Sequence, residues 1–113
     1  MVAKFFFTNQ YGRALGAIED FIFATTNSIE QVIHFLDEHD DVLEFIAQNP
    51  ETPVVHPATG DQSWIFCDGR YRVFFCYVAK GESIDIFLTD IIDNRQANLH
   101  VYSKNSIPTY SEE

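Results

Sequence analysis

The sequence predicts an α+β fold in which an α-helical hairpin packs on a twisted antiparallel β-sheet, in the order β-α-α-β-β-β. Two observations lead to this prediction. Residues 63–89 hold three runs of aromatic and β-branched residues, separated by the turn dipeptides Asp68-Gly69 and Lys80-Gly81. Residues 11–49 instead repeat apolar residues at the spacing of amphipathic helices, whose apolar stripes need a sheet to cover them.

Composition limits the architecture to one domain. The chain has 113 residues, of which 46% are hydrophobic and 15% aromatic, so we expect an ordered domain over residues 1–102 and a polar tail over residues 103–113. No apolar run approaches the roughly 20 residues of a membrane helix, and the N-terminus lacks a signal-peptide pattern. We therefore expect a cytoplasmic protein that makes no membrane contact, with Cys67 and Cys76 as reduced thiols.

The charge is strongly negative. Seventeen acidic residues against seven Lys and Arg give a net charge of −10. Direct binding of free nucleic acid requires clustered positive charge, so this composition argues against it. A basic protein partner or a soluble surface is compatible with it.

The N-terminal half predicts an edge strand and two helices. Residues 2–8 read as the strand, with Asn9 as the cap of a helix that follows from Tyr11. The second helix starts at a capping box, made either by Asn27 with Glu30 or by Ser28 with Gln31. It ends at Asn49-Pro50, and the run 39–41 is a candidate kink.

The meander has a testable register. With Lys80-Gly81 as the second turn, Tyr77 faces Ile84, Phe75 faces Ile86 and Val73 faces Leu88, which makes one sheet face uniformly apolar. The less buried face then presents Arg70 and Arg72 together. After the last strand, residues 90–99 read as a short helix capped by Asp90.

This element order, with the motif Gly69, Tyr71, Arg72, Val73 and Phe75, resembles the RelE/ParE toxin superfamily over residues 3–95. The resemblance implies a small toxin of a type II toxin–antitoxin pair, neutralised by a cognate antitoxin. The resemblance is compatible with two activities: ParE-like inhibition of DNA gyrase by protein–protein contact, or RelE-like cleavage of messenger RNA on the ribosome.

The sequence departs from the nucleolytic branch in its charge. Residues 29–62 contain no Lys or Arg, although RelE-like nucleases are strongly basic in this region. An acidic loop stabilises the charge that builds on a phosphate poorly. We therefore expect a ParE-like protein. The ribosome-dependent endonuclease and an inactive toxin-fold binding module are the alternatives, and a homodimer is compatible with the sequence.

The candidate residues follow from these readings. The expected partner-binding residues are Trp64, Arg70, Arg72, Phe74 and Phe87, and the residues considered for catalysis are Arg70, Arg72, Arg95 and His100. Arg72 also has a purely structural interpretation, as an ion-pair partner of Asp85 or of an acidic residue on a helix. His56 and His100 are candidates to approach Arg72 in space, whereas Tyr71 alternates to the apolar face and is expected in the core. No metal site and no cofactor is expected.

Overall fold

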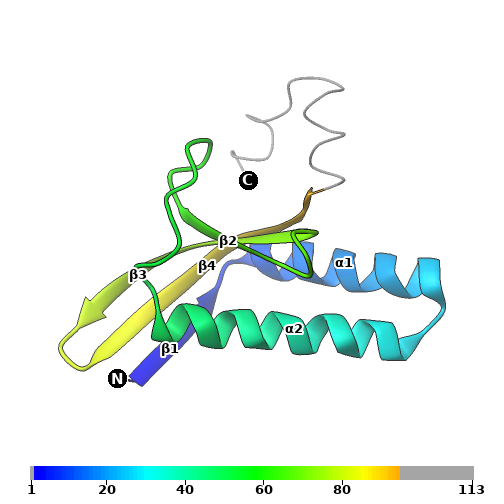
Figure 1. The fold of residues 1–113 in the computed structure, drawn as a ribbon, viewed down its shortest axis with the longest axis horizontal. Coiled ribbons are helices and arrows are strands. Elements are labelled where there is room, and N and C mark those ends of the chain that lie inside the picture. Colours follow the sequence, from blue (N-terminus) through cyan, green and yellow to red (C-terminus); the bar gives the residue numbers. More distant parts are fainter. Residues whose placement is uncertain (1, 95–113) are drawn as a thin grey trace.

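A computed structural model describes residues 2–94 and has the predicted order of one strand, two helices and three strands. The strands are β1 (Val2–Phe7), β2 (Gln62–Phe66), β3 (Tyr71–Lys80) and β4 (Ser83–Asp93), and the helices are α1 (Asn9–Thr26) and α2 (Ile29–Gln48). Figure 1 shows the two helices running side by side as a hairpin across the sheet. The expected tail at 103–113, and the domain residues after 94, lie outside the described residues.

The sheet is mixed, because β1 runs parallel to β4. The strand order is β1-β4-β3-β2, so β1 is an edge strand as predicted, and β2, β3 and β4 form the predicted antiparallel meander. The expectation that the whole sheet is antiparallel is wrong for β1. The chain leaves β1, crosses one face of the sheet as the helical hairpin, and returns to the far edge at β2.

Both helices begin at a hydroxyl cap. Thr8, rather than the expected Asn9, caps α1, and its Oγ1 accepts a hydrogen bond from the Tyr11 backbone N–H at 3.0 Å. Ser28 caps α2 and accepts from the Gln31 N–H, which decides between the two predicted capping boxes. The helix α2 continues through residues 39–41, so the sequence there does not split it.

From Phe75 to Lys80 the register of β3 with β4 differs from the prediction by two residues, and beyond a bulge Val73 lies opposite Ile91 in place of Leu88. The turn lies at Gly81-Glu82, with Lys80 opposite Ser83, and Tyr77 therefore faces Ile86 and not Ile84. A slip of two residues keeps every side chain on its original face. The predicted apolar face is consequently preserved and forms the core with both helices, including a buried Tyr71. The first turn has positive φ at Asp68 and Gly69, as expected.

The strand β4 extends to Asp93, which overturns the predicted start of a helix at residue 90. A bulge between Phe74 and Phe75 leaves Thr89 without an opposite residue, and pairing resumes from Asp90 onwards. Residues 90–93 therefore form backbone hydrogen bonds with β3 in place of the intrahelical hydrogen bonds of the predicted helix. The remainder of the predicted helix lies outside the described residues.

A buried polar pair joins the two helices inside this core. The Tyr11 hydroxyl and the Nε2 atom of His39 lie 2.6 Å apart, and both residues are almost inaccessible to solvent. The rings of Phe35 and Phe66 pack around His39. Because burial disfavours the imidazolium form, the pKa of His39 is lowered, although Asp40 near its Nδ1 atom acts in the opposite direction.

Candidate functional site

The face of the sheet opposite the helices, called here the outer face, carries Arg72. Its Nη1 atom donates a 2.6 Å hydrogen bond to the Oγ atom of Ser63, which is buried on the neighbouring strand β2. Ser63 pairs with Phe74 in the β2–β3 register, two residues from Arg72, so both side chains share this face. Strand alternation thus presents Arg72, and a neutral hydroxyl fixes its guanidinium.

The expected ion pair between Arg72 and Asp85 does not form. Asp85 instead lies 3.0 Å from the Nζ atom of Lys80, near the other end of the strand. Within residues 2–94, no carboxylate oxygen lies within 4.0 Å of the Arg72 guanidinium. The cation of Arg72 is therefore held in place without being neutralised by direct contact within this range.

His56, a candidate to approach Arg72, lies near enough for the charge of Arg72 to affect its protonation. The loop of residues 50–61 folds over the β2 and β3 half of the outer face, and the His56 ring packs edge-on against Phe74 at 5.4 Å. Burial lowers the pKa of His56, and the positive charge of Arg72 lowers it further. The second candidate, His100, lies outside the described residues, as does Arg95.

The protonation of His56 follows from its hydrogen bonds. Its Nδ1 atom accepts a hydrogen bond from the Ala58 backbone N–H at 3.2 Å, so in the neutral ring the proton is on Nε2. The ring therefore presents a donor and not a free lone pair. This arrangement suits a contact with a polar acceptor better than it suits proton abstraction by a general base.

Threonine and aspartate side chains tie the loop to the sheet. The Thr89 hydroxyl donates to the Oδ2 atom of Asp61 at 2.7 Å, and the Thr8 hydroxyl donates to the Thr89 carbonyl at 2.9 Å. The Gln62 amide donates to the carbonyl oxygens of Pro50 and Pro53, both at 2.8 Å. The contacts of Asp61, Pro50 and Pro53 hold the loop against the sheet.

Arg70 does not share this position, which corrects the expectation that the two arginines project together. Its Nε atom lies 3.7 Å from the Oδ2 atom of the buried Asp93, and its guanidinium lies over the Tyr71 ring at 5.2 Å. Arg70 follows the positive-φ turn at Asp68-Gly69, which directs the side chain toward the helices. Its structural role is to pair with the buried Asp93.

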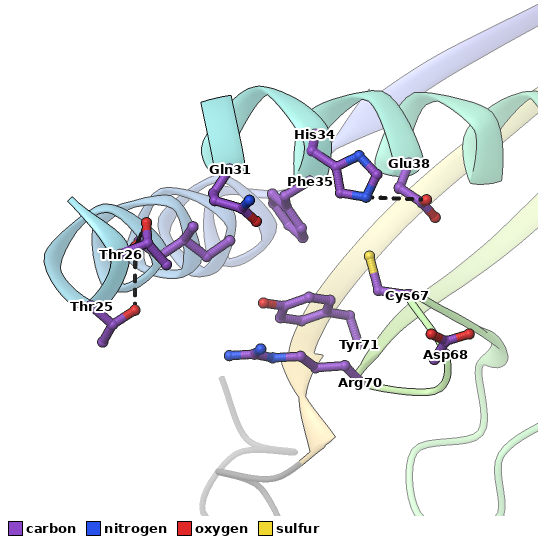
Figure 2. A pocket seen from close by; sticks show the side chains of 11 residues that line it. Thr25, Thr26, Gln31, His34, Phe35, Glu38, Cys67, Asp68, Arg70 and Tyr71 are labelled. Carbon is purple, nitrogen blue, oxygen red and sulfur yellow. Dashed lines mark hydrogen bonds and ion pairs between the residues drawn. The ribbon is translucent and has the colours of Figure 1, made fainter. Parts of the chain in front are cut away.

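Figure 2 shows Arg70 and Tyr71 extending together into a pocket below α2. The pocket has a volume of about 310 Å³ and lies between the tip of the hairpin and the β2–β3 turn. Cys67 points into it toward Glu38. Burial, and then the charge of Glu38, raise the pKa of Cys67 to about 11, so this thiol is protonated at neutral pH and is a poor nucleophile.

The apolar candidates for partner binding are distributed over both faces. Trp64 lies on the helical side, where it stacks on Phe45 at 4.9 Å. Phe74 is only 1% exposed beneath the loop, so it is not available at the surface. Phe87 is half-buried on the outer face and stacks on Phe6 at 5.1 Å. Of the three, Phe87 is the one that lies beside exposed apolar surface, which Phe6 and Val78 supply.

Two residues that the sequence did not identify are important in the structure: Ser63 in the site and His39 in the core. Ser63 had no signal in the sequence, because its importance depends on the pairing of β2 with β3. His39 was considered only as part of the candidate kink at residues 39–41, although its spacing of four residues from Phe35 places both on one helix face. Neither Cys is in a disulfide.

Within residues 2–94 there is no group of three or more His, Cys, Asp or Glu side chains arranged to hold a metal ion. No helix in the same range is long and apolar enough to cross a membrane. No protein-family model matches the chain, and no curated protein matches its sequence. The resemblance to the RelE/ParE superfamily therefore depends on the motif and on the order of elements.

The lowered histidine pKa values predict a pH dependence of stability. An unfolded histidine has a pKa of about 6.5. Below pH 6.5 the histidines of the unfolded chain bind protons, whereas folded His39 and His56 have lower pKa values and bind fewer. The free energy of unfolding therefore has its full value above about pH 6.5 and decreases as the pH falls below it. Each histidine contributes at most about 1.4 kcal/mol per pH unit. Urea unfolding between pH 7.5 and 5 measures this slope, and His39→Gln should reduce it; an unchanged slope would contradict the assignment.

Proposed function

We propose that this protein is the toxin of a type II toxin–antitoxin pair, that it acts by binding a protein target of the gyrase type, and that a cognate antitoxin neutralises it. The observation that carries the proposal is Arg72, the arginine of the Gly-x-Tyr-Arg-Val signature, held by Ser63 on the outer face at 2.6 Å. A fixed guanidinium that no carboxylate within residues 2–94 contacts directly is well suited to bind a carboxylate of a partner protein.

The surroundings of Arg72 favour protein contact over RNA cleavage. The loop beside it contributes Asp61 and a histidine whose proton is on Nε2, and residues 29–62 supply no Lys or Arg. Cleavage of RNA needs cations to stabilise the phosphate and a base to remove a proton. The same face offers Phe6 and Phe87, whose stacked rings supply the apolar area that a protein interface requires.

Expression of the chain without an antitoxin tests the proposal. We expect growth arrest, together with inhibition of DNA supercoiling by gyrase in vitro and no cleavage of ribosome-bound messenger RNA. Transcript cleavage would support the ribosome-dependent endonuclease instead. Normal growth at a verified level of folded protein would contradict the toxin assignment and leave the inactive binding module.

A further inference from the structure

The outer edge of β1 is an open strand edge on which no described strand pairs. β1 lies at the end of the sheet order, and three of its six residues are exposed apolar side chains: Val2 at 64%, Phe6 at 44% and Phe7 at 49%. Open, apolar edge strands promote pairing with another chain unless a bulge, proline or covering segment blocks them. β1 contains no proline and pairs with β4 without a register shift.

The opposite edge of the sheet is covered. The loop of residues 50–61 approaches β2, where the Ser63 N–H donates to the Val54 carbonyl at 3.1 Å and Val55 forms an isolated bridge with Gln62. The described part of the chain thus protects one edge of its sheet and leaves the other available.

The hydrogen bonds to β4 show which backbone groups of β1 are available. The N–H groups of Val2 and Thr8 donate to the carbonyl oxygens of Glu82 and Leu88, at 3.0 and 3.1 Å. The backbone N–H and C=O groups of successive residues point to opposite sides of a strand, so the backbone groups of the even-numbered residues of β1 point toward β4. The N–H and C=O groups of Ala3, Phe5 and Phe7 therefore point away from the sheet.

We propose that β1 pairs antiparallel with β1 of a second copy of this chain, across a two-fold axis at Phe5, to form one continuous eight-stranded sheet. In this register Phe5 lies opposite Phe5 of the second copy, and Ala3 lies opposite Phe7. All three outward-facing residues then exchange backbone hydrogen bonds, about six in total for the interface. The small Ala3 leaves room for the ring of Phe7.

Charge favours a second copy as the occupant and selects this register. All seventeen acidic residues of the chain lie at or after Glu19, so residues 1–18 carry only the charges of Lys4 and Arg13. The edge is thus the part of an acidic protein where two copies meet without acid facing acid along the strand. A register shifted by two residues toward the N-terminus would place Lys4 opposite Lys4, whereas the proposed one lays Lys4 over the Phe6 ring. A shift of two residues the other way would place Ala3 opposite Asn9, which belongs to α1, and would lose the backbone pairing at Ala3.

This inference is independent of the toxin assignment, and the oligomeric state of the full chain tests it. We expect a dimer by light scattering and sedimentation. Ala3→Pro removes an N–H group that points away from the sheet and leaves the hydrogen bonds between β1 and β4 in place. It should therefore give a folded monomer with an unchanged far-ultraviolet circular dichroism spectrum. Phe7→Pro should act in the same way. Ile65→Ala changes an exposed residue of β2, at the opposite edge of the sheet, and is the control that should remain a dimer.

Cysteine cross-linking tests the register. In a Cys76→Ser background, Phe5→Cys should give a disulfide-linked dimer on oxidation, because opposed Cα atoms in this geometry are about 5.5 Å apart. Phe6→Cys should not, since Phe6 lies opposite Lys4. A wild-type monomer at all concentrations, a dimer that survives both proline substitutions, or cross-linking at position 6 in place of position 5 would each overturn the proposal.

Discussion

Arg72→Ala is expected to abolish growth arrest while leaving the protein folded. The guanidinium makes its described hydrogen bond to a neutral hydroxyl, Ser63, so its removal leaves no buried acid without a partner. Loss of a central arginine from a protein interface typically costs at least about 2 kcal/mol, or about 30-fold in affinity. Colony counts under induction and titration against purified gyrase would measure this effect.

Substitutions of two other arginines serve as controls for Arg72→Ala. Arg13 is exposed on α1 and donates to the Gln10 side chain at 3.3 Å, so Arg13→Ala should arrest growth as the wild type does. Arg70→Ala should instead lower stability, because it removes the ion pair with the buried Asp93 at 3.7 Å and the contact of the guanidinium with the Tyr71 ring. If Arg72→Ala arrested growth as strongly as Arg13→Ala, the outer face would not be the binding surface.

His39→Leu is expected to destabilise the fold by about 1–3 kcal/mol, because the fully buried Tyr11 hydroxyl loses its partner at 2.6 Å. Tyr11→Phe alone should also destabilise, since it leaves the imidazole without this bond. The double variant removes both polar groups and should be more stable than His39→Leu alone. Urea unfolding at pH 7.5 of all four proteins gives the coupling energy; additive effects would show that the pair contributes no specific interaction.

The sequence alone determined the elements and the buried face of the sheet. Hydrophobic periods of two and of about 3.6 residues follow from which residues are buried in a strand or a helix. The start of α2 at residues 27–28 and the positive-φ turn at Asp68-Gly69 depend on neighbours within a few residues, although the choice of Ser28 over Asn27 as the cap came from the structure. The face of the meander was correct even though the register was not, because a slip of two residues preserves alternation.

The tertiary structure decided the features that depend on residues far apart in the chain. The parallel pairing of β1 with β4 joins segments about 80 residues apart. The residues of β1 alone do not show whether it runs parallel or antiparallel to its neighbour. The bulge at Thr89 and the extension of β4 to Asp93 follow from the partner strand.

Only the folded chain also separates Arg70 from Arg72. The meander motif places them two residues apart, where strand alternation puts them on one face. The turn before β3 and the buried charge of Asp93 direct Arg70 to the helical side, while Ser63 on a different strand holds Arg72 on the outer face. The sequence therefore identified the motif, and long-range packing determined which of its arginines is presented on the outer face.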